Sequence, residues 1–277
     1  MAAARWSRHL ELPLVVLHAY DPAPLGPSAS SPLPTWPTQA GKRAVERGAQ
    51  ARIDELRGGL LAGVTFEAVL KEHPRASLSV CDYADEDDLV VVGTHGRTGV
   101  RRVLMGSVAE QTVRHAPCPV LVVRGEVDIA TFPSSVVVCT DFSKASVPAV
   151  AMAGRIARAF EAPATLLYVE HTDVWQQATE DVDDDAKLRE LRAQLDRALA
   201  ELHEEHLPAP VETQLVVSDH RPEGIVTHAD KRGADLLVLA THGRSGLARL
   251  VIGSVTERVV RTAPCPVLVV RSGVGDA

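Results

Sequence analysis

The chain has no long apolar run, few aromatic residues, few cysteines and no excess of positive charge. None of its apolar runs approaches the ~18–20 residues that a membrane-spanning helix needs, and only residues 12–17 are continuously apolar near the N-terminus, too few for a secretory signal. A net charge of −7 over 277 residues argues against a broad nucleic-acid-binding surface. Four cysteines without a C-x-x-C pair exclude a dense disulfide framework and favour a reducing cytoplasm.

What the chain does contain is an internal repeat. Residues 89–124 and 236–271 align without gaps at a constant offset of 147, and 23 of the 36 positions are identical. Two homologous units therefore lie in tandem, as the length also suggests. We expect one domain over residues 1–125 and a second over residues 133–272, joined by the short segment 125–133.

The second unit alternates runs of β-branched and apolar residues with helical patterns. This alternation predicts an α/β domain, with a doubly wound parallel sheet covered by helices on both faces. The expected strands are residues 136–140, 164–169, 211–217, 235–240 and 266–271, and the expected helices are residues 143–160, 183–206, 221–232 and 254–262.

The first unit follows the same pattern but begins later. Residues 8–13 align with residues 158–163, so nothing in this unit corresponds to the strand 136–140 or to Asp141. The first strand of a doubly wound sheet is central, so we expect the natural chain to start about seventeen residues earlier. The remaining elements are expected at residues 14–19, 64–70, 89–93 and 119–124 (strands), 39–61 (a helix) and 21–38 (a proline-rich insert).

Each unit carries a glycine-bearing loop between a strand and a helix. Glycine allows the main chain to approach a ligand closely, and a helix N-terminus offers free N–H groups to phosphate oxygens. Ser107 and Ser254 are expected to cap these helices, and Arg97 and Arg244 could neutralise phosphate charge. The alternative is that the glycines serve only the backbone of the loop. The two loops read Gly93-x2-Gly96-x9-Gly106-Ser107 and Ala240-x2-Gly243-x9-Gly253-Ser254.

With these loops and the repeated A-P-C-P-V-L-V-V strand, the chain resembles a tandem universal stress protein. The family motif is G-x2-G-x9-G-[S/T]. The resemblance implies two Rossmann-like domains of the adenine nucleotide alpha hydrolase type, the first without its first strand here. It also implies ATP, with Mg²⁺, as the bound ligand, and pairing of the two final strands as an intramolecular pseudo-dimer. A homodimer is a further expectation.

The resemblance also assigns binding residues. Asp141, after Thr140, would contact adenosine, and the backbone near Val169 would line the adenine pocket. Phosphates would be held in the second unit by Ala240, Gly243, Arg244, Gly253, Ser254, Val255 and Thr256, and in the first by Gly93, Gly96, Arg97, Gly106, Ser107 and Val108. Two departures weaken the match, because Ala240 replaces the first glycine and Cys139 replaces the usual proline.

These features predict a cytoplasmic stress-response protein that binds ATP and acts as a regulator or interaction partner. No catalytic residue and no metal ligand is expected, and neither nucleic acid nor a membrane is an expected partner. One alternative is an interaction module whose loops no longer bind nucleotide. A slow ATPase or phosphotransferase is a second, although neither loop contains Asp or Glu. The pair His203 and His206 lacks the H-E-x-x-H pattern and indicates a solvated helix face.

Overall fold

A computed structural model describes most of the chain, in two compact units, Met1–Ala84 and Asp85–Ala277. The domain boundaries expected from the repeat differ from this division and remain predictions. Within the described residues, no helix is long and apolar enough to cross a membrane. The proline-rich insert and the pair His203 and His206 lie outside the described residues, which are 1–21, 39–94, 105–124, 127–128, 130–173, 186, 189–190, 192–194, 196–197, 211–243 and 252–271.

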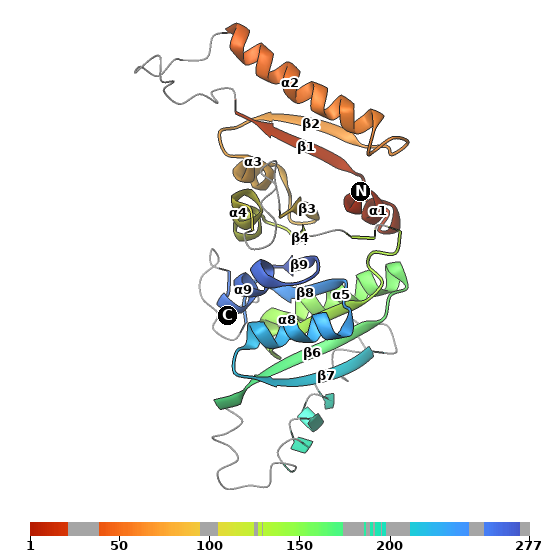
Figure 1. Cartoon of the computed structure of the whole chain (residues 1–277), viewed down its shortest axis with the longest axis vertical. Helices are drawn as coiled ribbons and strands as arrows, with labels where there is room; N and C mark the ends of the chain where they lie inside the picture. Colours follow the sequence, from red (N-terminus) through yellow and green to blue (C-terminus); the bar gives the residue numbers. More distant parts are fainter. Residues whose placement is uncertain are drawn as a thin grey trace, which may run out of the picture. The chain divides into compact units, whose positions relative to one another are not determined.

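The larger unit is built on a seven-stranded sheet (Figure 1). Its order is β3-β4-β9-β8-β5-β6-β7, and all neighbours are parallel except β4 and β9. β5 lies between β6 and β8, and its first three valines are almost fully buried, as expected of a parallel strand covered on both faces. The strands are β3 (Val90–Gly93), β4 (Val120–Val123), β5 (Val136–Thr140), β6 (Ala164–His171), β7 (Val211–Ser218), β8 (Leu236–Ala240) and β9 (Val267–Val270).

Helices cover both faces of the second-repeat part of this sheet. The strand order reverses at β5, and right-handed crossovers then place α5 and α8 on opposite faces. α5 packs on β5, and α8 packs on β6, β7 and α9 (Figure 1). The fold predicted from the sequence, an α/β domain with a mostly parallel sheet, is therefore confirmed. The helices are α4 (Ser107–His115), the 3₁₀ turn η1 (Lys144–Ser146), α5 (Val147–Phe160), α8 (Arg221–Arg232) and α9 (Ser254–Thr262).

The two repeats join through their final strands. β4 pairs antiparallel with β9, and Leu121 lies opposite Leu268, its own counterpart at the offset of 147. Both leucines are completely buried. This self-complementary pairing is that of an isologous dimer interface formed within one chain, and it confirms the pairing expected from the resemblance.

The smaller unit holds the N-terminal part of the first repeat. Its two strands, β1 and β2, form a parallel sheet of their own. β6, the counterpart of β1, pairs on both sides with β5 and β7, whereas within the described residues β1 pairs only with β2. The elements are α1 (Ala2–His9), β1 (Val15–Tyr20), α2 (Gln39–Gly58), β2 (Glu67–Glu72) and α3 (Ala76–Tyr83).

The equivalence of α1 with the end of α5 is visible in the backbone. Glu11 and Glu161, which align in the sequence, both follow their helices in the left-handed region, at φ 55° and φ 53°. One expectation for this unit needs correction, and one helix was not predicted. β2 begins at Glu67 and not at residue 64, because the chain is still turning at Gly63, where φ is 76°. The helix α3 lies in a region for which the sequence pattern gave no helix, since it is short and weakly amphipathic.

Candidate functional site

A pocket of about 310 Å³ opens at the carboxyl ends of β5, β6 and β8. This is the edge of a doubly wound sheet at which ligands bind, next to the strand where the order reverses. The N-terminal residues of α8 and α9 complete the wall. The lining is Cys139, Thr140, Asp141, Ser146, Leu167, Tyr168, Val169, Arg221, Ile225, Leu239, Ala240, His242, Gly243, Gly253, Ser254, Val255 and Thr256.

The residues expected at the second-repeat site lie together around this pocket. Nine of the ten line it, and Arg244 lies outside the described residues. They come from the end of β5, from β6, from the end of β8 and from the start of α9. The first and last of these segments are more than a hundred residues apart in the sequence. The parallel order of the strands brings their carboxyl ends to one edge.

Asp141 is held in place by its neighbours. Its Oδ1 accepts hydrogen bonds from the Ser143 N–H at 3.1 Å and from Ser143 Oγ at 2.6 Å. Thr140 Oγ1, which lies 2.9 Å from Ser146 Oγ, also accepts a hydrogen bond from the Phe142 N–H. These bonds fix the turn after β5, so the Asp141 carboxylate has a defined position in the pocket.

Gly243 faces this carboxylate at close range. A Cβ built on Gly243 would lie 2.4 Å from Asp141 Oδ2, well inside van der Waals contact. The absence of a side chain at Gly243 leaves room for the Asp141 carboxylate, and a larger residue would displace it.

Ala240, which replaces the first glycine of the motif, is an ordinary strand residue. Among the described non-glycine residues, positive φ occurs at Glu11, Phe142 and Glu161, and Ala240 is not one of them. Its methyl group therefore causes no backbone strain. Its carbonyl accepts a 2.7 Å hydrogen bond from Thr256 Oγ1, which ties the first turn of α9 to the end of β8.

The capping role expected of the two serines is wrong. The N-cap residues are Gly106 and Gly253, in extended conformations, and Ser107 and Ser254 are the first helical residues. The reason is a contact between the cap and the preceding strand. The Gly106 N–H donates to the Thr94 carbonyl at 2.9 Å, and the Gly253 N–H donates to the Thr241 carbonyl at 2.8 Å, which leaves little room for a side chain.

Sequence reasoning missed Arg221, which lines the pocket, and Glu170, the buried carboxylate that it contacts. Glu170 is buried, and it accepts hydrogen bonds from Tyr168 Oη at 2.5 Å, from the His171 N–H at 2.8 Å and from Arg221 Nη2 at 3.1 Å. Burial raises the pKa of Glu170, but these hydrogen bonds outweigh it and leave the pKa below its ordinary value. The available signal was the position of Tyr168 and Glu170, two residues apart at the carboxyl end of a strand, and therefore on one face.

The cysteines behave as packing residues. Cys118 and Cys265 are buried, and all four cysteines are free thiols. Burial raises the pKa of the Cys139 and Cys265 thiols, so both are neutral near pH 7. Cys139 thus contributes a small apolar surface to the pocket wall.

Comparison with known proteins gives the same family twice along the chain. The model of the universal stress protein family matches residues 2–124 and again residues 134–271. The chain belongs to the universal stress protein family. As a tandem universal stress protein, it is 27% identical to the universal stress protein Rv2005c of Mycobacterium tuberculosis over 279 residues, covering 98% of this chain and 92% of that one. It is 29% identical to one of Mycolicibacterium smegmatis over 288 residues, with the same coverage.

Solved structures support the fold. A universal stress protein from Archaeoglobus fulgidus superposes with a TM-score of 0.69 at 17% identity, covering 98% of this chain and 92% of that one. A protein of unknown function from Pseudomonas aeruginosa, PA1789, gives a TM-score of 0.60 at 16% identity, covering 98% and 86%.

The first repeat of this universal stress protein keeps part of the same loop geometry. Gly93 ends β3, Gly106 caps α4, and the exposed residues Ser107 and Val108 begin that helix. Gly96 and Arg97 lie outside the described residues. The described residues of this repeat contain no counterpart of β5 or of Asp141, so the second repeat has the more complete set of expected binding residues.

Proposed function

We propose that the second repeat binds ATP in this pocket and that the chain is a nucleotide-dependent regulator or interaction partner in the cytoplasm. The observation that carries the proposal is the convergence of Asp141, Val169, Gly243 and the start of α9 on one pocket at the switch point of the sheet. The four free thiols are consistent with a reducing compartment.

The start of α9 suits the phosphates. Gly253 has no side chain to block the approach, and the first N–H groups of a helix point outward and attract anions. The exposed Ser254 adds a hydroxyl donor. Adenosine would lie toward Asp141 and Val169, where apolar groups from Ile225 and Leu239 also line the pocket.

Mg²⁺ would arrive with the nucleotide. Among the described residues, no group of three or more His, Cys, Asp or Glu side chains could hold a metal ion. Mg²⁺ needs no such group here, because it keeps several waters and binds mainly through the phosphates of its nucleotide.

We place this protein among regulators and not among enzymes. Asp141 is the only carboxylate among the described lining residues, and the two hydrogen bonds from Ser143 fix it as an acceptor. Such a group suits binding of hydroxyl or amino donors. A phosphotransferase would in addition need a base or a nucleophile beside the phosphates.

The test compares Ser254→Glu with Ser107→Glu in the full chain by calorimetric titration of ATP and Mg²⁺. Both serines are exposed and begin helices, where an acidic residue is tolerated or favoured, so both variants should fold. Ser254→Glu places a negative charge beside the phosphates, and we expect it to weaken ATP binding by about tenfold or more. Ser107→Glu is the matched control in the first repeat and should change the affinity by less than about twofold.

Three results would contradict the proposal. The absence of heat with the wild-type chain at near-millimolar ATP would reject nucleotide binding and favour the interaction module. A loss of affinity in Ser107→Glu alone would move the site to the first repeat. Hydrolysis of ATP that is lost in Ser254→Glu would indicate an enzyme.

A further inference from the structure

An arginine from the first repeat caps the helix that forms the proposed phosphate site of the second. Arg124 follows β4, and its guanidinium donates three hydrogen bonds to main-chain carbonyls at the end of α9. Nη1 donates to Ala263 at 2.9 Å, and Nη2 donates to Val260 at 3.2 Å and to Arg261 at 2.7 Å. These carbonyls have no partner within the helix, and the negative end of the helix dipole lies there.

α9 is a short helix that runs from the pocket to the carbonyls capped by Arg124. It has nine residues, which corresponds to a length of about 13.5 Å. Its first three residues line the pocket, and its last turn receives Arg124. No side chain caps its N-terminus. Hydrogen bonds hold both of its ends, from Thr256 to the Ala240 carbonyl and from Arg124 to its last carbonyls, and its buried side packs against α8.

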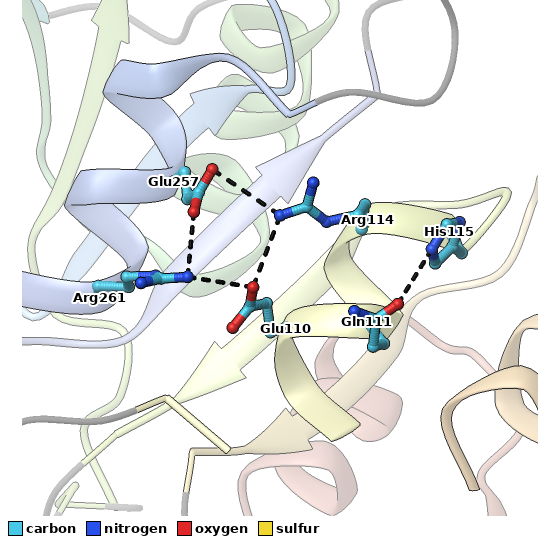
Figure 2. Close-up of polar contacts among 6 residues, drawn as sticks. All are labelled: Glu110, Gln111, Arg114, His115, Glu257 and Arg261. Atoms are coloured by element: carbon cyan, nitrogen blue, oxygen red, sulfur yellow. Dashed lines mark hydrogen bonds and ion pairs between the residues drawn. The ribbon is translucent and has the colours of Figure 1, made fainter. Parts of the chain in front are cut away.

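The middle of α9 is also connected to the first repeat. Figure 2 shows Glu110 and Arg114 of α4 facing Glu257 and Arg261 of α9. Arg261 Nη2 lies 3.1 Å from Glu110 Oε1 and 3.0 Å from Glu257 Oε1, and Arg114 Nη2 lies 3.8 Å from Glu257 Oε2. These side chains are partly exposed, so water and salt screen their ion pairs and each pair makes a modest contribution.

We propose that Arg124 is a positioning residue for the second-repeat pocket, acting through α9. The inference rests on the proposed function. Phosphate binding at a helix N-terminus requires that the N–H groups sit within a fraction of an ångström of their productive positions. By fixing the far end of a short, rigid helix, Arg124 makes the pocket of the second repeat dependent on the first repeat.

The chain supplies its own matched control. Arg271 is the counterpart of Arg124 at the offset of 147, and its Nη1 donates to the Ala116 carbonyl at the end of α4. Arg271 thus has the same chemistry at the same strand junction, but it caps the helix of the first repeat. Loss of either arginine should weaken the junction, and only loss of Arg124 should change the pocket of the second repeat.

The experiment uses full-length Arg124→Met, Arg124→Lys and Arg271→Met, with two measurements on each. The first is amide hydrogen exchange of α9 and α4 without nucleotide. The second is calorimetric titration with ATP and Mg²⁺. In Arg124→Met we expect exchange of the hydrogen-bonded amides of α9, from Glu257 onward, to be about tenfold faster. We expect ATP affinity to be about five- to tenfold weaker, the effect of losing a partly buried cation at a helix C-terminus.

The other two variants show whether the effect is specific. Arg271→Met should accelerate exchange in α4 and leave ATP affinity within about twofold of wild type. Arg124→Lys keeps the charge but not the three-carbonyl geometry, so it should restore part of the loss.

Unchanged exchange in α9 of Arg124→Met would overturn the inference. Equal losses of ATP affinity in Arg124→Met and Arg271→Met would also overturn it, because they would indicate general loosening of the junction. If wild type binds no ATP, the proposed function fails, and the exchange measurement still decides whether Arg124 fixes α9.

Discussion

At the scale of the residue, the pocket depends on one carboxylate and one glycine that face each other. Asp141 could be assigned from the resemblance to the family, and Gly243 because it belongs to a repeated loop. Their mutual contact could not be predicted, since it depends on the side-by-side placement of β5 and β8. The same reason explains why Arg221, which lies 51 positions from Glu170, was not recognised as part of the site.

Glu170 provides a test of electrostatics at this scale. We expect Glu170→Gln to lower the free energy of unfolding by about 1–2 kcal/mol at pH 7, because it removes the charge that Arg221 and Tyr168 stabilise. The contact with Arg221 contributes only a small part of this free energy, because the Arg221 side chain is partly exposed and water screens its charge. Urea denaturation of both proteins measures the difference.

The pH dependence has a definite sign. The pKa of Glu170 is lowered in the folded chain, so its contribution is complete above the unfolded carboxyl pKa of about 4.3 and is lost as the pH falls through the folded value. The gap between wild type and Glu170→Gln should therefore shrink below about pH 4.3. Glu223→Gln removes an exposed pair with Arg258 and serves as the control, with an expected cost below about 0.5 kcal/mol. A gap that is unchanged at low pH would contradict this account.

At the scale of the element, the two helices that follow the glycine loops begin in the same way. The N–H groups of Gly106 and Gly253 both donate a hydrogen bond to the carbonyl of the residue that follows the preceding strand, Thr94 after β3 and Thr241 after β8. The repeat predicted that these glycines share a role, and the structure shows that the role is a close contact between backbones. The start of α9 at residue 254 was predicted correctly. Serine is the better cap by statistics alone, but the contact with the preceding backbone leaves little room for a side chain at the cap.

This contact predicts an order of stabilities for glycine-to-alanine variants. A Cβ at Gly106 would lie 2.9 Å from the Thr94 carbonyl oxygen, and one at Gly253 would lie 3.2 Å from the Thr241 carbonyl oxygen. We expect Gly106→Ala to cost about 1–3 kcal/mol, because backbone must move, and Gly253→Ala to cost less. Thermal and urea unfolding will rank them.

Gly48 provides the control. It lies within α2, and a Cβ there meets nothing within 4 Å. Gly48→Ala should therefore stabilise the chain by about 0.5–1 kcal/mol, through the better helix propensity of alanine. If all three substitutions had similar effects, contact with the strand would not be the reason for glycine at the loops.

At the scale of the whole molecule, the two repeats are joined by a buried pair of strands and by a ring of four charged side chains connected by ion pairs. The strand pair centres on Leu121 and Leu268, and the ring consists of Glu110, Arg114, Glu257 and Arg261. The fully buried leucines should dominate the stability of the junction, because partly exposed ion pairs are screened by water and salt.

Two variants separate these contributions. We expect Leu268→Ala to lower the free energy of unfolding by about 2–5 kcal/mol through the cavity that it leaves. Glu110→Gln should cost at most about 1 kcal/mol, and its effect should fall as salt is raised from 0.05 to about 0.5 M. Chemical denaturation at two salt concentrations distinguishes them, and a larger effect of Glu110→Gln than of Leu268→Ala would show that the ring is the main connection.

The sequence by itself determined the family, the alternation of strands and helices, and the segments that could form a binding site. These properties are local or repeated, so hydrophobic period, glycine spacing and a constant offset are sufficient to find them. Only the tertiary structure decided which residues meet: Gly243 with Asp141, Arg221 with Glu170, and Arg124 with the end of α9. Such contacts depend on strand order and on the antiparallel pairing of β4 with β9, which bring together groups far apart in the chain. No local sequence pattern shows which of these distant groups will meet.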